Sequence, residues 1–142
     1  MLKLTKKVEY ALIALRHMHQ KGLECISSAK EIAEEYKVPY EILAKTLQQL
    51  ARNQVVNAIQ GPKGGYKINP GIDQMNLVQF IEMMEGPTGL VDCQIKDDCL
   101  RFDTCNIRIP IANINRNVRR LLQNISLADI LIQESISCND PE

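Results

Sequence analysis

Apolar side chains recur at three- and four-residue steps in several segments of the chain, which is the spacing of one face of an amphipathic helix. In residues 6–21 this apolar face consists of Val8, Ala11, Leu12, Leu15 and Met18. The next residue is Gly22, a residue type that commonly ends a helix. The pattern therefore predicts a first helix over residues 6–21.

Two further helices are predicted, with a short connection between them. The capping-box sequence at 28–31 opens a helix that is expected to reach about Tyr36. Pro39 suits the first turn of the next helix, which is predicted over residues 40–53. Its apolar side would carry Ile42, Leu43, Leu47 and Leu50. Helices separated by about three residues have the spacing of a helix-turn-helix, although ordinary helical hairpins share that spacing.

A β-hairpin is predicted directly after these helices. Residues 55–59 and 66–68 are β-prone, and they flank the turn sequence Gly61-Pro62-Lys63-Gly64-Gly65. A helix-turn-helix followed by a hairpin is the element order of a winged helix. The Lys63 ammonium and the backbone amides around Gly64 suit phosphate oxygens, so DNA is the expected partner of this region.

The second half of the chain begins with a predicted helix over residues 76–85, followed by a polar stretch at 87–106. Apolar residues then recur at steps of four and three, which is a heptad seam. The seam consists of Ile107, Ile111, Ile114, Val118, Leu121 and Ile125. So narrow a stripe needs a partner helix, and a symmetric homodimer supplies one most simply. The alternative is a partner helix within the same chain, for example the helix at 6–21. A last short helix is predicted over 127–132.

These elements predict a mainly α-helical fold with a small β-hairpin. We expect a winged helix-turn-helix DNA-binding domain in residues 1–70, and a linking helix with a cysteine loop in residues 71–106. Residues 107–142 would form a long dimerisation helix and a tail. Counted along the sequence, residues 1–70 hold eleven Lys and Arg against six Asp and Glu, and residues 71–142 hold six against eleven. The basic half is the half predicted to bind DNA.

Composition excludes several classes of protein. The chain has 142 residues, of which 45% are hydrophobic and 24% charged, as in one ordinary globular domain. Its start lacks the apolar core of a signal peptide, and no early apolar run approaches the length of a membrane span. A cytoplasmic protein without a membrane partner is expected. No Cys-x-x-Cys pair, phosphate loop or nucleophile–base pattern indicates an enzyme such as a thiol reductase.

Three cysteines indicate the chemistry of the polar stretch. Cys93, Cys99 and Cys105 are separated by five residues each time, whereas structural zinc sites use pairs two to four residues apart. Thiolates on a flexible polar loop suit an iron–sulfur cluster, with one ligand position left for another group. Cys25 and Cys138 are interpreted as buried or incidental thiols.

The sequence resembles the IscR/NsrR group of bacterial transcription regulators, the Rrf-two family, from about residue 2 to 132. The resemblance rests on Leu4-Thr5-Lys6, on Gly61-Pro62-Lys63-Gly64-Gly65-Tyr66, on the three cysteines, and on the segment 124–129. It implies a homodimer that binds a palindromic double-stranded DNA operator through two winged helices. It also implies one iron–sulfur cluster, 2Fe-2S or 4Fe-4S, in each subunit, and sensing of nitric oxide, redox state or iron–sulfur supply.

The chain departs from the IscR pattern at the fourth ligand. IscR-like members have a histidine three residues after the last cysteine, where this chain has Arg108. NsrR-like members take an acidic ligand from the first helix of the partner subunit, and alignment to that pattern selects Glu9. His17 and His19 are rival ligands that are expected to face solvent. An exchangeable carboxylate ligand that links the first helix to the partner's cysteine loop would connect the signal to the spacing of the two DNA-binding domains.

The helix-turn-helix reading assigns the DNA contacts. On the second helix of the motif we expect Tyr40, Glu41, Lys45, Gln48 and Gln49. Phosphate contacts are expected from Lys3, Lys6, Ser28, Lys30 and the wing residues Lys63 and Gly64. Gln60 stands where IscR-like members have an arginine, which predicts weaker minor-groove reading. A cluster-free thiol-switch or zinc-dependent repressor of the same fold is the alternative.

Overall fold

The computed structural model describes residues 3–91 and 99–132 of the chain. In chain order the elements are α1 (Lys6–Lys21), α2 (Ala29–Tyr36), α3 (Tyr40–Arg52), β1 (Val56–Ile59), β2 (Gly65–Ile68), the 3-10 helix η1 (Pro70–Gln74), α4 (Leu77–Glu85), α5 (Arg108–Gln123) and α6 (Leu127–Ile132). The predicted mainly helical fold with one hairpin is confirmed. Within the described residues, no helix combines the length and apolarity needed to cross a membrane.

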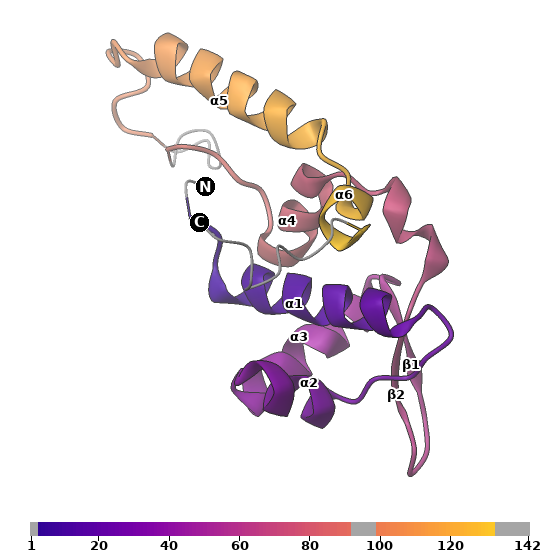
Figure 1. The fold of residues 1–142 in the computed structure, drawn as a ribbon. Helices are drawn as coiled ribbons and strands as arrows, with labels where there is room; N and C mark the ends of the chain where they lie inside the picture. The colour runs from indigo at the N-terminus through magenta and orange to yellow at the C-terminus, as the bar shows by residue number, and fades with distance from the viewer. Residues whose placement is uncertain (1–2, 92–98, 133–142) are drawn as a thin grey trace, which may run out of the picture.

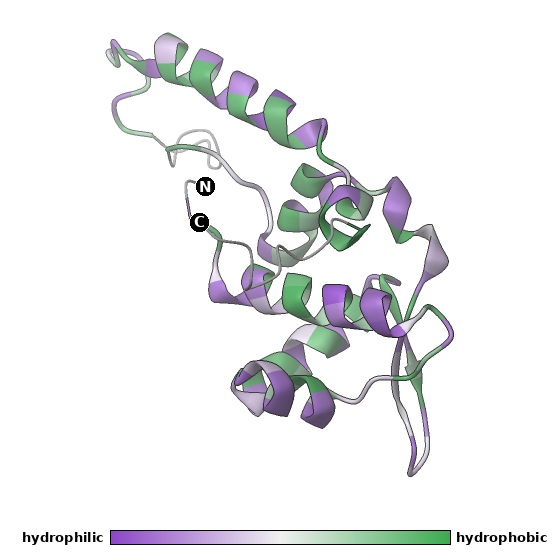
Figure 2. Cartoon of the chain, viewed as in Figure 1, coloured by the Kyte–Doolittle hydropathy of each residue, from purple (hydrophilic) through white to green (hydrophobic). Residues whose placement is uncertain are grey.

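Helix α1 is the centre of the molecule. Its buried residues are Val8, Ala11, Ala14, Leu15 and Met18. Four of these five were predicted. The predicted Leu12 is only partly buried, and Ala14 is buried although it was not predicted. Helices α3, α4 and α6 all pack against α1. Figure 2 shows apolar residues on the inner sides of these helices and polar residues on their outer sides. Burial of each large apolar side chain stabilises the fold by about 1.5–3 kcal/mol, so this shared core fixes the helices relative to one another.

The hairpin is antiparallel, with Val56 opposite Ile68 and Ile59 opposite Gly65. A further backbone bridge joins its second strand to the α1–α2 connection. Ser27 donates its N–H to the Tyr66 carbonyl at 2.9 Å, and Tyr66 donates to the Ser27 carbonyl at 2.8 Å. The hairpin is therefore attached at its base to the helices, while its tip extends away from them (Figure 1).

Helix α6 returns to the core formed by residues 8–84. Leu127 and Leu131 are buried there, and Arg16 on α1 donates to the Ile130 carbonyl at 2.7 Å. The segment predicted as dimerisation helix and tail, 107–142, is thus divided in space, since α5 leaves the core and α6 rejoins it. Long helix α5 and the tip of the hairpin lie at opposite ends of the molecule (Figure 1).

The observed elements differ from the predicted ones mainly at their ends. Helix α5 has 16 residues, Arg108–Gln123, and is shorter than the seam over 107–125. Helix α4 begins at Leu77 because Asn76 forms a capping box with Gln79. The 3-10 helix at Pro70–Gln74 was not predicted, because five residues give no helical repeat.

Candidate functional site

Helix α3, the candidate recognition helix, has two faces with opposite surroundings. Its buried face consists of Leu43, Thr46, Leu47 and Leu50. The opposite face carries Glu41, Lys45 and Gln48, all of them exposed. Positions three and four residues apart lie in one row on a helix, so these three side chains point outward together. The row therefore forms an exposed polar face along α3.

Several residues of α3 depart from the sequence prediction. Gln49 is half-buried and donates its Nε2 hydrogen to the Met84 carbonyl oxygen at 3.2 Å, so it holds α4 and lies outside the outward row. Ile42, predicted on the apolar side, is 45% exposed. Tyr40, in contrast, was predicted to project from the helix and is 56% exposed. Arg52 is exposed on the outward row and was missed, although its four-residue step from Gln48 was a usable signal.

The connection between α2 and α3 is a tight turn. Lys37 ends α2 with φ 55°, in the left-handed region, and Val38 is buried. Pro39 precedes α3 without a side-chain cap. At the other end of α2, the Ser28 hydroxyl oxygen accepts a hydrogen bond from the Glu31 N–H at 3.0 Å. The Ser28 hydroxyl proton and the exposed Lys30 ammonium remain available for a phosphate.

A polar network connects α1 to α2, and it was not predicted. His17 Nε2 lies 2.7 Å from Glu31 Oε2, and His17 Nδ1 lies 2.9 Å from the Tyr36 hydroxyl. Lys21 donates to both carboxylate oxygens of Glu31. The prediction that His17 faces solvent is wrong, since its side chain is 11% exposed and takes part in this network. His19 is also partly buried.

The network shifts the titration of Glu31. Partial burial opposes ionisation of this carboxyl, but hydrogen bonds from His17 and Lys21 outweigh the burial and lower its pKa. A carboxylate only accepts hydrogen bonds, so Nε2 of His17 donates to Glu31. The ionised Glu31 therefore fixes the orientation of α2 on α1.

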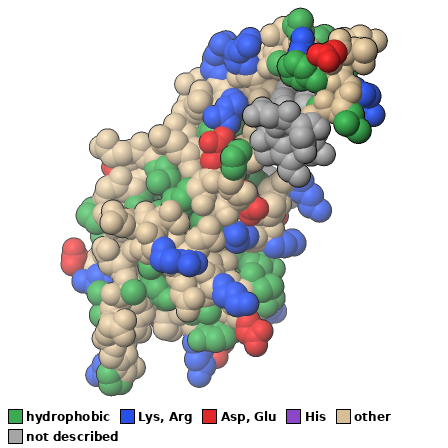
Figure 3. Space-filling model, turned by 180° about the vertical axis from the view of Figure 1, so that it is seen from behind, with side chains coloured by type: hydrophobic (Ala, Val, Ile, Leu, Met, Phe, Trp, Pro, Cys, Tyr) green, Lys and Arg blue, Asp and Glu red, His purple; other side chains and the backbone are tan. Residues whose placement is uncertain are grey.

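The wing tip is built from glycines that other residues could not replace. Gly61 has φ 117°, and a Cβ on Gly64 would lie 2.2 Å from the Ile59 carbonyl oxygen. These positions force the chain to reverse sharply and leave Lys63 exposed at the tip. Figure 3 shows Lys and Arg side chains spread over the face of the molecule opposite to the view of Figure 1.

The start of α1 holds three further predicted residues. Lys3 is exposed, and Lys6 forms an ion pair with Glu9 at 3.1 Å. The hydrogen bond to Glu9 raises the pKa of the exposed Lys6 ammonium. The Glu9 side chain is 38% exposed, so it remains accessible to a second molecule.

Two of the three predicted cysteine ligands lie in the described residues, and Cys93 lies outside them. Cys99 and Cys105 are free, partly buried thiols at the two ends of one turn. The Phe102 N–H donates to the Cys99 carbonyl at 3.3 Å, and the Arg108 guanidinium lies 4.2 Å from the centre of the Phe102 ring. Arg108, which replaces the IscR histidine, is thus held against the cysteine turn by a cation–π contact. No trio of His, Cys, Asp or Glu side chains comes together within the described residues. Cys25 is exposed, so of its two interpretations, a buried or an incidental thiol, the buried one is wrong. Cys138 lies outside the described residues.

The predicted seam of α5 divides between two surroundings. Ile107, Ile114 and Leu121, seven residues apart, are 53%, 49% and 64% exposed. The remaining seam residues Ile111, Val118 and Ile125 are partly buried. The alternative of a partner helix within the same chain applies to this partly buried side, where α4 packs against α5 and Glu82 pairs with Arg119. That partner is α4, and not the helix at 6–21 that the sequence suggested as an example. An apolar edge of α5 therefore stays open.

The chain is similar to known transcription regulators over nearly its whole length. Residues 4–133 match the Rrf2 family, described as iron-dependent transcriptional regulators. The chain is 24% identical to the HTH-type regulator IscR of Sodalis glossinidius, over 95% of this chain and 82% of the relative. It is 23% identical to the HTH-type regulator NsrR of Halalkalibacterium halodurans, over 94% of this chain and 92% of the relative.

A solved structure supports the same assignment. CymR, the global cysteine regulator of B. subtilis, superimposes with a TM-score of 0.72 at 25% identity, over 94% of this chain and 99% of CymR. The family match covers the helix-turn-helix, the wing, the cysteine turn and both C-terminal helices. The chain accordingly belongs to the Rrf2 family of transcriptional regulators and is not an enzyme.

Proposed function

We propose that this regulator binds a palindromic double-stranded DNA operator as a homodimer. The observation that carries the proposal is that the exposed polar row of α3 and the exposed wing tip with Lys63 are both attached to one core. Helix α3 would enter the major groove and the wing would contact the neighbouring backbone or minor groove. The proposed contacts are Lys3, Lys6, Ser28, Lys30, Tyr40, Glu41, Lys45, Gln48, Arg52, Lys63 and Gly64.

The contacts have different proposed roles. Gln48 and Lys45 would read base edges, because an amide matches adenine and an ammonium matches guanine. Arg52, Lys63 and Lys30 would bind phosphates and set the register of the protein on the duplex. Gln49 is left out of the interface because its amide holds α4. Residues 1–70 are thus proposed as the DNA-binding domain, joined through residues 71–106 to the dimerisation segment.

We propose further that α5 forms the dimer interface. The exposed edge of Ile107, Ile114 and Leu121 repeats every seven residues, which suits a second copy of the same helix. The two-fold symmetry of such a dimer would match the palindrome of the operator.

For the sensing site we propose one iron–sulfur cluster per subunit, held by Cys93, Cys99 and Cys105 with Glu9 of the partner subunit. Cys99 and Cys105 support it, since free thiols on one turn are the donors that such clusters take. The cluster, 2Fe-2S or 4Fe-4S, would react with nitric oxide or oxygen, and its presence or absence would report the iron–sulfur supply. Arg108 would offset the negative charge of the thiolates on the turn that it contacts.

A cluster-free thiol switch is the second candidate. Cys99 and Cys105 are free thiols and neither is fully buried, so an oxidant can reach both of them. A repressor that binds zinc through the same three thiolates is a related possibility, and it would be colourless like the thiol switch.

An absorption spectrum with iron and sulfide counts, on protein purified without oxygen, separates these candidates. A visible chromophore with iron and sulfide that is lost in Cys99→Ala and kept in Cys25→Ala is the result expected for the cluster. Cys25→Ala is the matched control, because Cys25 is an exposed cysteine on the α1–α2 connection. A colourless, iron-free protein that still binds DNA would leave the thiol switch or zinc.

A second experiment tests the DNA interface. Fluorescence anisotropy with an operator selected from random DNA should show that Lys45→Ala and Arg52→Ala each weaken binding at least about tenfold. Glu34→Ala, a change on exposed α2 surface, is the control and should bind as the unchanged protein does. Equal affinity for all variants would contradict the placement of α3 in the groove.

A further inference from the structure

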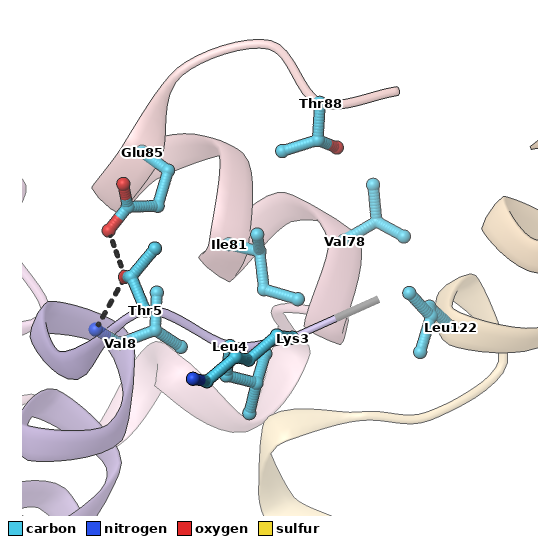
Figure 4. A pocket seen from close by; sticks show the side chains of 9 residues that line it. All are labelled: Lys3, Leu4, Thr5, Val8, Val78, Ile81, Glu85, Thr88 and Leu122. Atoms are coloured by element: carbon cyan, nitrogen blue, oxygen red, sulfur yellow. Dashed lines mark hydrogen bonds between the residues drawn. The ribbon is translucent and has the colours of Figure 1, made fainter. Parts of the chain in front are cut away.

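A small cavity lies where the start of α1, helix α4 and helix α5 meet. Its volume is about 100 Å³, and its apolar lining comes from Leu4, Val8, Val78, Ile81 and Leu122. Figure 4 shows these side chains around one space, contributed by three separate elements. An apolar space of this kind repels water and accepts an alkyl group.

The mouth of the cavity carries one positive and one negative side chain. Lys3 is exposed and, within the described part of the chain, has no ion-pair partner. The Glu85 carboxylate accepts a hydrogen bond from the Thr5 hydroxyl, whose oxygen in turn accepts from the Val8 N–H (Figure 4). An ionised carboxylate accepts up to about four hydrogen bonds, so Thr5 leaves capacity on Glu85 for a ligand.

We propose that this cavity binds a small aliphatic α-amino acid. The alkyl side chain would fill the apolar space, the ligand carboxylate would pair with Lys3, and its ammonium would pair with Glu85. A zwitterion pairs with Lys3 and Glu85 at once. A simple acid would leave Glu85 without a partner, and a simple amine would leave Lys3 without one.

Volume sets the size of the ligand. A cavity of about 150 Å³ holds the six carbons of benzene, so about 100 Å³ accommodates roughly three or four carbon atoms. The isopropyl group of valine and the isobutyl group of leucine have this size. The aromatic ring of phenylalanine does not fit.

The position of the cavity indicates what binding would do. Helix α1 packs against α3, and α4 packs against α5, so a ligand that touches α1, α4 and α5 lies between the DNA-binding helix and the open helix. Occupancy would therefore change operator affinity, a consequence that rests on the proposed function. The binding itself does not depend on DNA.

Calorimetric titration of the full-length chain tests the site. L-Valine and L-leucine should bind with Kd below about 1 mM, while isovalerate and isobutylamine, which each lack one charged group, should bind at least about tenfold more weakly. L-Phenylalanine should not bind. The proposal would be overturned if neither aliphatic amino acid saturated the protein up to about 10 mM, or if isovalerate or isobutylamine bound as tightly as valine.

Two variants locate the site. Leu122→Phe fills the cavity and Lys3→Met removes the cation, and each should weaken valine binding at least about tenfold. Lys3 is exposed, so Lys3→Met tests the site even where Leu122→Phe fails to fold. Arg120→Met, an equal loss of charge on exposed α5 surface, is the control. Unchanged valine binding in Lys3→Met would overturn the proposed site. If the unchanged protein bound valine but no DNA, that result would contradict only the proposed function.

Discussion

At the scale of single residues, exposed lysines differ in whether they already form an ion pair within the protein. Those without such a pair are the ones that can bind DNA phosphates. Lys63 stands at the wing tip and, among the described residues, has no ion-pair partner. Lys21, also exposed, donates to Glu31 and to the Ile26 carbonyl and is thereby committed to the α1–α2 connection. A lysine without a partner gives its full charge to a phosphate, because no internal bond must be broken first.

Lys63→Ala should therefore lower affinity for all DNA sequences to a similar extent, and should reduce the slope of log affinity against log salt by about 1. Titration of operator and unrelated DNA at several salt concentrations measures both quantities. Arg116→Ala, which removes an exposed charge from α5, serves as the comparison. If the salt slope of Lys63→Ala equalled that of the unchanged protein, the wing would not contact phosphate.

Glu31 gives a prediction about pH. Its pKa is lowered in the folded chain, so its ionised form adds stability above the unfolded pKa of about 4.5, and this stability is lost as pH falls through the folded pKa. Glu31→Gln should lower the free energy of unfolding at pH 7 by roughly 1 kcal/mol or less, since the side chain is partly exposed. The difference should shrink toward pH 3. Urea unfolding at both pH values measures the difference in free energy of unfolding between the variant and the unchanged protein, and Glu34→Gln is the control. An equal difference at pH 7 and at pH 3 would contradict the role of ionised Glu31.

At the scale of elements, α5 differs from every other long helix of the described chain because it buries no residue fully. Its inner side packs against α4, and the three residues of its other apolar edge are each about half exposed or more, as far as the described residues go. Apolar edges with a seven-residue repeat are stabilised by a second helix, and the same edge on a second copy is complementary to it under two-fold symmetry. The open edge of α5 is thus the part of the molecule that an assembly would change most.

Leu121→Asp should weaken dimerisation at least about 100-fold, because a symmetric interface loses two buried leucines and gains two charges. Light scattering during size-exclusion chromatography over a range of concentrations measures the change. Gln123→Glu adds a negative charge to an exposed position two residues away and should leave the dimer intact. A dimer of unchanged strength in Leu121→Asp would place the interface elsewhere.

At the scale of the whole molecule, α4 is the connection between the DNA-binding helices and α5. Lys7 on α1 donates to the Met84 carbonyl at 3.2 Å, Gln49 on α3 donates to the same carbonyl, and Glu82 pairs with Arg119 on α5. The direction of α5 relative to α3 therefore depends on α4. In a dimer joined through α5, these contacts would set the distance between the two copies of α3.

Arg119→Gln should loosen this connection and weaken the preference for one half-site spacing. We expect the unchanged protein to prefer one operator spacing by at least about tenfold over spacings one base pair longer or shorter, and the variant to discriminate less. Binding titrations on the three operators give the ratio. Arg116→Gln is the control, because the Arg116 guanidinium donates to Asn113 on the same helix. The same ratio in Arg119→Gln would show that spacing is set by other contacts.

Local patterns in the sequence were sufficient for most of the fold. The helical repeats, the capping box at 28–31 and the turn at 61–65 predicted α1 and α2 to the residue, and α3, the hairpin and α4 to within a residue or two. These features depend on interactions between residues close in the chain, which is why the sequence alone determined them. The family resemblance came from the same short segments.

What only the tertiary structure decided are the neighbours of each side chain. Gln49 and Arg52 lie three residues apart on one helix, yet Gln49 holds α4 while Arg52 faces outward, because α4 covers only one side of α3. His17 meets Glu31, and α6 returns to α1, through contacts between residues far apart in the chain. Such contacts follow from how the helices pack together, and a repeat within one helix carries no information about which other helix will cover it.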